Sequence, residues 1–116
     1  MPRRRPGVLL DLEEQILQVG CDRASAGPAW FYGFALATEL EGSSGSRRLL
    51  GHGTLYKALD RLEREGYLES RWEVGDPSAL GRPRRREYRV TPAASPALER
   101  SRQLRQAQPG VRWSPA

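Results

Sequence analysis

Hydrophobic residues between positions 53 and 66 recur with the period of an α-helix. Leu55, Leu59 and Leu62 are spaced i, i+4 and i+7, so they fall on one helix face. Gly66 follows, where it can end a helix in the left-handed conformation that other residues avoid. The opposite face is polar and, on balance, cationic. The pattern predicts an amphipathic helix with one buried and one solvated face.

The pattern then changes to that of a β-hairpin. Residues 67–74 alternate in part and are rich in aromatic and branched side chains, which predicts a strand. Residues 75–83 contain two glycines and two prolines and predict a turn. Residues 86–90 predict a second strand. A helix followed by a hairpin is the second half of a winged helix-turn-helix, in which the helix enters the DNA major groove and the wing contacts the backbone or minor groove.

Two helices are predicted ahead of this unit. Residues 8–19 have apolar positions three or four apart and carboxylates near the N-terminal end, where they suit the helix dipole. Gly20 is expected to stop this helix, and residues 22–29 to form a loop. The aromatic cluster 30–34 is expected to pack in the core or in a dimer interface, although it could also line a ligand pocket. The second helix is expected over 33–41.

The chain therefore divides into four parts. Residues 1–7 form a basic tail, expected to be flexible, that could alternatively act as a DNA-contacting arm. Residues 8–92 form the winged helix-turn-helix. Residues 93–108 form a short C-terminal helix, with Ser95 as its expected N-cap, and residues 109–116 a flexible tail. The fold class is α+β and mainly α, with three helices and a two-stranded wing before the C-terminal helix.

Two motifs stand out in this arrangement. They are GTLYKALDRLEREGYL at 53–68 and GRPRRREYRVTP at 81–92. In combination they resemble the PadR family of bacterial transcriptional regulators, and the similarity covers most of residues 8–100. His52 departs from the family, which often has proline or serine there. The resemblance implies a sequence-specific DNA-binding regulator, expected to be a repressor that binds a palindromic operator as a homodimer, and some related regulators respond to a small-molecule effector.

The charge distribution points to the same partner. The chain has 116 residues, enough for one domain, and a formal net charge of +5. Residues 1–80 hold ten Arg or Lys against twelve Asp or Glu, whereas residues 81–105 hold eight arginines against two glutamates. Basic charge is thus concentrated on the wing and the segment after it. This is the expected footprint of a surface that contacts phosphates.

The candidate DNA-binding residues follow from these positions. Side chains on the solvated face of the helix are expected to read bases, although the ring of Tyr56 could instead be partly buried. Basic residues before the helix and on the wing are expected to hold phosphates, although the wing cluster could serve only solubility. The full set is Arg47, Arg48, His52, Gly53, Thr54, Tyr56, Lys57, Asp60, Arg61, Arg82, Arg84 and Arg85.

A homodimer is expected through the first and last helices. A single winged helix could not cover all of the apolar residues that these helices carry, so a second copy is expected to cover them. These residues are Leu9, Leu12, Ile16, Leu98 and Leu104.

Other functions lack the residues that they need. With one histidine, one cysteine and no phosphate-binding glycine loop, we expect no enzyme activity, no metal site and no cofactor. A single cysteine fits a reducing cytoplasm, and no apolar run is long enough for a membrane span. The remaining alternative is a winged-helix module that binds protein or RNA, because fold alone does not fix function.

Overall fold

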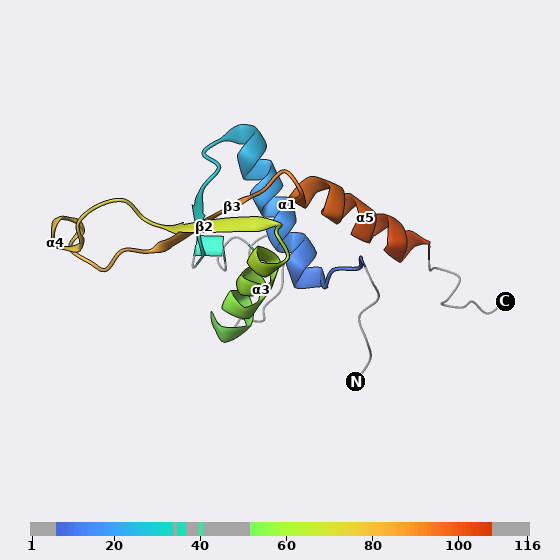
Figure 1. The fold of residues 1–116 in the computed structure, drawn as a ribbon, viewed down its shortest axis with the longest axis horizontal. Helices are drawn as coiled ribbons and strands as arrows, with labels where there is room; N and C mark the ends of the chain where they lie inside the picture. Colours follow the sequence, from blue (N-terminus) through green and yellow to red (C-terminus); the bar gives the residue numbers. More distant parts are fainter. Residues whose placement is uncertain (1–6, 34, 37–39, 41–51, 108–116) are drawn as a thin grey trace.

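A computed structural model of the chain describes residues 7–33, 35–36, 40 and 52–107 (Figure 1). Residues 33, 35, 36 and 40 have helical backbone, in the range where the second helix is expected. The described residues leave out most of the predicted N-terminal tail, the C-terminal tail and the rest of the second-helix range. They also leave out Arg47 and Arg48. The elements in chain order are α1 (Asp11–Ala26), β1 (Phe31–Tyr32), α3 (His52–Arg64), β2 (Leu68–Trp72), α4 (Pro77–Leu80), β3 (Arg86–Val90) and α5 (Ala94–Gln106).

The first helix is longer than predicted. The sequence indicated a stop at Gly20, but α1 continues through it to Ala26 and ends at Gly27, which has a φ of 61°. Gly20 is buried, and a Cβ atom there would clash with Cγ1 of Val90 on β3. The glycine therefore allows α1 to approach the sheet closely, and it does not terminate the helix.

The predicted two-stranded wing is confirmed as β2 and β3, and β1 adds a third antiparallel strand, in the order β1-β3-β2. β1 has only two residues, too few for an alternating pattern to be seen in the sequence. It pairs with β3, and Phe31 lies opposite Tyr88 with ring centroids 6.3 Å apart. Phe31 is buried in the core, as expected for part of the aromatic cluster. Trp30 and Tyr32 are only half-buried.

The core lies between one face of the sheet and the helices. Leu55, Leu59 and Leu62 of α3 are fully buried, which confirms the predicted apolar face of that helix. They pack in one cluster with residues of α1 and with the sheet residues Leu68 and Tyr88. Burying each leucine contributes on the order of 1.5–3 kcal/mol, so this face fixes how α3 is mounted.

The C-terminal helix α5 packs on α1 of the same chain. Leu9, Ile16 and Leu98 are buried in the core cluster, with exposed fractions of 7%, 0% and 5%. The chain thus covers these three predicted interface residues itself, which leaves them little surface for a second copy. Leu12 and Leu104 are half-buried.

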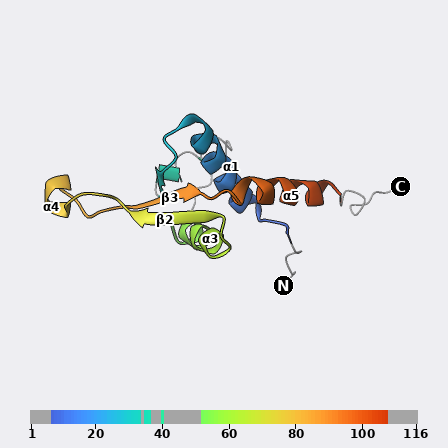
Figure 2. The same cartoon turned by 45° about the horizontal axis from the view of Figure 1, so that its top comes forward.

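The ends of the last elements also differ from the prediction. The cap residue of α5 is Ala93, not Ser95, and its N–H donates to Oγ1 of Thr91 at 3.3 Å. The predicted turn 75–83 contains the short helix α4, which Gly81 closes with a φ of 74°. Figure 2 shows α4 at the far end of the hairpin, away from α1, α3 and α5.

Candidate nucleic-acid interface

The solvated face of α3 is the centre of the candidate interface. Thr54, Lys57 and Asp60 are exposed on it, and Asp60 pairs with Arg64 one turn later at 3.6 Å. Lys57 makes no hydrogen bond or ion pair with another described residue, so its ammonium group is available to a ligand. Gly53 is exposed at the start of the helix, and a Cβ atom there would meet nothing within 4 Å. His52 begins α3, but its side chain is outside the described set.

Tyr56 lies at the border between the solvated and buried faces. Its side chain is 38% exposed. A Cβ atom built on Gly33 would lie 3.0 Å from Cε1 of Tyr56 and 3.1 Å from its hydroxyl oxygen. One edge of the ring thus packs against the backbone of Gly33, which agrees with the expectation that it could be partly buried. A residue larger than glycine at position 33 would displace this ring.

Arg61 does not project from the solvated face as predicted. Its Nε lies 3.2 Å from Oε2 of Glu13 on α1, and the Glu13 side chain is only 1% exposed. The other oxygen of Glu13 accepts the N–H of Leu10 at 2.9 Å, which holds the start of α1. A buried carboxylate needs a cationic partner, and Arg61 supplies it. Arg61, predicted as a DNA contact, is thus held by Glu13 in the DNA-free chain.

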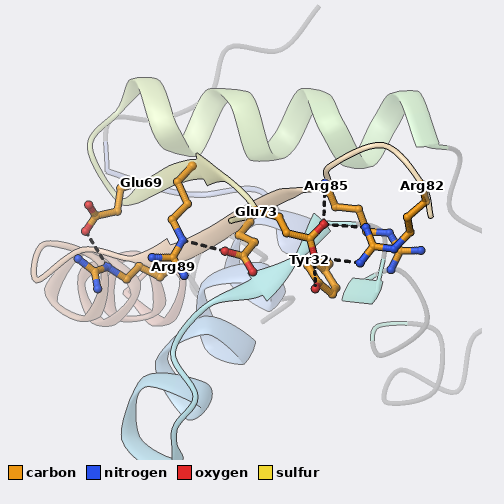
Figure 3. Close-up of polar contacts among 8 residues, drawn as sticks. Tyr32, Glu69, Glu73, Arg82, Arg85 and Arg89 are labelled. Atoms are coloured by element: carbon orange, nitrogen blue, oxygen red, sulfur yellow. Dashed lines mark hydrogen bonds and ion pairs between the residues drawn. The ribbon is translucent and has the colours of Figure 1, made fainter. Parts of the chain in front are cut away.

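Arg82 on the wing is also engaged within the chain. Its two terminal nitrogens donate to the two oxygens of Glu73 at 2.7 and 2.9 Å, a bidentate pair. Figure 3 shows Arg82, Arg85 and Tyr32 gathered around this carboxylate. The Tyr32 hydroxyl donates to it at 2.7 Å and the backbone N–H of Arg85 at 3.1 Å. Arg82, predicted as a phosphate contact, is thus bound to Glu73 in the DNA-free chain.

These hydrogen bonds shift the pKa of both acids in the cluster. Arg82 is the largest cause and the Tyr32 hydroxyl the next, and together they lower the pKa of Glu73 from 4.5 to about 2. The same hydrogen bond raises the pKa of Tyr32, because the hydroxyl proton is held by the carboxylate. Glu73 therefore stays ionised, and the base of the wing stays closed, at neutral pH.

The other wing arginines differ in how many contacts they make within the chain. Arg84 is exposed and forms no hydrogen bond or ion pair with the described residues. The guanidinium of Arg85 lies 5.4 Å from the ring centre of Tyr32. Arg86 donates to Oγ of Ser70 at 2.8 Å and lies 4.9 Å from the ring centre of Trp72. Arg84 is thus the wing arginine best placed for an external anion.

More arginines are paired on the outer sheet face, the side away from the core. Arg71 binds Glu87 at 2.7 Å, and Arg89 binds Glu69 at 3.0 Å. Trp30 lies beside both arginines, with their guanidinium carbons 3.9 and 4.6 Å from its ring centre. Such cation–π contacts restrain both partners. The free cationic surface is therefore smaller than the arginine content indicates.

Two wing residues were missed by the sequence analysis. Trp72 and Val74 are 58% and 80% exposed, which is unusual for large apolar side chains in a hairpin stem. Trp72 shares the α3 side of the sheet with Ser70, whose hydroxyl donates to Glu63 of α3 at 2.7 Å. The alternation of Leu68, Ser70 and Trp72 could have placed the indole on that side. Its exposure could not have been read from the sequence.

The described residues offer little to other ligand classes. None of them form a group of three or more His, Cys, Asp or Glu side chains placed to hold a metal ion. Within the same part of the chain, no helix combines the length and apolar character that a bilayer crossing needs.

Comparison with known proteins identifies relatives with this arrangement. The pattern of the transcriptional regulator PadR-like family matches residues 27–100. A transcriptional regulator from Clostridium thermocellum has a similar structure, with a TM-score of 0.66 and 22% identity over 85% of this chain and 86% of that one. A PadR family transcription regulator from Clostridium difficile gives 0.60 and 23% over 86% and 92%.

The circadian clock associated protein Pex from Anabaena gives a TM-score of 0.56 and 28% identity over 96% of this chain and 90% of that one. A search of curated proteins finds no match. The matched family segment contains α3 and the whole wing, and the solved structures share the winged-helix fold. The chain belongs to the PadR-like family of transcriptional regulators.

Proposed function

We propose that this chain is a repressor that binds a palindromic operator as a dimer. Membership of the family supports a DNA-binding regulator, a non-catalytic role and a place in the cytoplasm. The observation that carries the proposal is how α3 packs on the core. Its three leucines are fully buried, while Thr54 and Lys57 are left exposed on the opposite face. A rigid helix with an uncommitted polar face suits insertion into a major groove.

Base readout is proposed for Thr54, Lys57 and Asp60, with the hydroxyl of Tyr56 beside them. Lysine can donate to guanine, a hydroxyl can donate to or accept from base edges, and a carboxylate can accept from cytosine. The exposed Gly53 would let the backbone approach DNA closely. Arg47, Arg48 and His52 remain predicted contacts near the start of α3.

The wing is proposed to contact phosphates through Arg84 and through Arg85, which lies next to the start of β3. Arg84 has no partner among the described side chains, so binding a phosphate would break no internal pair. Trp72 and Val74 add apolar surface on the same hairpin. Such side chains suit the sugar edges and floor of a minor groove, where proteins often place apolar groups.

Dimerisation is proposed through the surfaces of α1 and α5 that the chain leaves uncovered. Leu12 and Leu104 are half-buried, and Leu10 next to α1 is 51% exposed. A two-fold pair would present two α3 helices to DNA, and the operator would then be palindromic. This proposal replaces the larger set of leucines expected from the sequence.

An effector site is proposed beside α1. A cavity of about 590 Å³ lies there, within the size range of small-molecule pockets. Its described lining includes the carboxylates of Asp11, Glu14 and Asp22 and the guanidinium of Arg102, and Arg105 pairs with both Glu14 and Asp11. This mixed polar lining suits a polar effector.

One experiment tests the function as a whole. The full chain would be used to select bound duplexes from a random DNA pool, and the selected duplex would then compete with random DNA at physiological salt. Specific binding predicts a preference of at least about a thousandfold, and the selected sequences should be palindromic. Equal competition by random DNA, or preferential capture of RNA, would instead support the alternative of a module for other partners.

A further inference from the structure

Two adjacent glutamates in the first turn of α1 bind different helices. Oε2 of Glu13 lies 3.2 Å from Nε of Arg61 on α3. Oε2 of Glu14 accepts the Ser101 hydroxyl at 2.6 Å and Nε–H of Arg105 at 2.9 Å, both from α5. The start of α1 therefore joins the DNA-reading helix to the C-terminal helix.

The Glu13 carboxylate is held from several directions. It is 1% exposed, and its Oε1 accepts the backbone N–H of Leu10. The backbone before it is fixed as well, because the N–H of Leu9 donates to Oγ of the buried Ser101 at 2.8 Å. A carboxylate that is both buried and fixed strongly favours keeping its cationic partner in place.

Arg61 would contact DNA if this partner were absent. It follows Thr54 by seven residues and Lys57 by four, so the three share one stripe of α3. An arginine there would add an attraction to phosphate that does not depend on sequence. In the structure the guanidinium is turned to α1, and its side chain is 39% exposed.

We propose that Glu13 is a positioning residue that determines specificity by withholding Arg61 from DNA and fixing α3 against α1. The inference rests on the proposed DNA-binding function. With Arg61 held back, discrimination between sequences depends on the shorter side chains of α3. Removal of the Glu13 charge releases a mobile arginine beside the groove and raises binding to any duplex.

The test uses Glu13→Gln and Arg61→Ala, singly and combined. Affinity for the selected operator and for random duplex is measured over a range of salt concentrations. Glu13→Gln should bind random DNA on the order of threefold tighter, with a salt slope steeper by about one unit. The preference for operator over random DNA should fall. In the double variant the slope should return to that of the wild type, because the released arginine is gone.

Two matched controls separate this effect from simple changes in charge. Glu99→Gln removes one negative charge from an exposed carboxylate on α5, whose observed partner is Gln103, so its slope should stay that of the wild type. Arg64→Ala removes an exposed arginine from α3 itself, and so shows how far the salt slope responds to the loss of any charge on this helix. A steeper slope in Glu99→Gln equal to that in Glu13→Gln would overturn the proposal.

Arg61→Ala alone gives the most direct decision. Its binding to random DNA and its salt slope should match the wild type, since Arg61 does not reach DNA. A slope lower by about one unit, with loss of preference at one base position, would instead make Arg61 a DNA contact and overturn the inference. This variant also decides the question if Glu13→Gln fails to fold.

A measurement without DNA keeps the inference separate from the proposed function. In nitrogen–proton NMR spectra, the Arg61 Nε–H should exchange slowly with water in the wild type and rapidly in Glu13→Gln. Rapid exchange in the folded wild type would show that Glu13 does not hold Arg61, whatever the chain binds. Slow exchange in a wild type that binds all duplexes equally would support the Glu13–Arg61 contact and refute the sequence-specific DNA-binding function.

Discussion

Helix α3 and the wing hairpin both present basic side chains, but they hold them in different ways. On α3, three buried leucines fix the helix, and Lys57 is left exposed beside them. On the wing, Leu68 and Tyr88 pack in the core, but Trp72 and Val74, further out along the hairpin, are exposed. There the geometry is fixed by charged groups, above all the pair of Glu73 with Arg82. The wing thus uses arginine for its own structure, whereas α3 relies on hydrophobic burial.

The difference changes how a basic segment should be interpreted. Four arginines lie between positions 82 and 86, yet Arg82 and Arg86 are hydrogen-bonded to wing side chains. On α3, Arg61 is likewise bound to Glu13. Formal charge predicts attraction to DNA at long range. We expect direct contacts with DNA from side chains that have no strong internal partner.

The largest expected effect concerns the apolar anchor of α3. Leu59→Ala should lower the free energy of unfolding by about 2–5 kcal/mol, because it leaves a cavity in a fully buried site. Chemical denaturation would measure the change. Lys57→Ala, two residues earlier on the exposed face, is the control and should stay within about 0.5 kcal/mol. Comparable losses in both would mean that α3 is not mounted by its leucines.

The next effect separates base readout from structure on the same helix. Lys57→Ala should weaken operator binding by about 1–3 kcal/mol and relax the preference at a particular base pair. Titration of the selected operator and its single-base variants would measure this. Arg64→Ala is a useful comparison, since Arg64 is exposed but lies in the last turn of α3. Unchanged operator affinity in Lys57→Ala would mean that Lys57 does not read a base.

A smaller effect distinguishes the two kinds of wing arginine. Arg84→Ala should weaken operator and random DNA by similar factors and lower the salt slope by about one unit. Arg82→Ala should leave the slope unchanged, because Arg82 is bound to Glu73, and should instead increase hydrogen exchange along β2 and β3. Binding isotherms at several salt concentrations would test both. An equal fall in slope for the two variants would remove the distinction.

The smallest expected effect is a pH dependence of the wing. The pKa of Glu73 is lowered in the folded chain to about 2, so the contribution of this acid to stability is present above its ordinary pKa of 4.5. It is lost as the pH falls from 4.5 towards 2. Carbon NMR of the Glu73 carboxyl group should show this low midpoint. Glu73→Gln should lose less stability across the same pH range. A Glu73 titration midpoint near 4.5 in the wild type would contradict the pairing of Glu73 with Arg82.

The sequence alone determined those parts whose pattern is local. The apolar period of α3 and the left-handed Gly66 after it were predicted, as were the bounds of β3 at residues 86–90. The winged-helix fold followed from their order. These features depend on neighbours within a few residues, where helix and strand periods leave a direct signal in the sequence.

Tertiary structure decided which residues remain free. Glu13 and Arg61 lie 48 positions apart, and no local pattern could pair them. Packing of α1 on the sheet made Gly20 a contact point where the sequence indicated a helix end. Docking of α5 on α1 likewise covered leucines expected to await a second copy. Burial and ion pairing depend on the elements that meet in space, so these assignments required the folded chain.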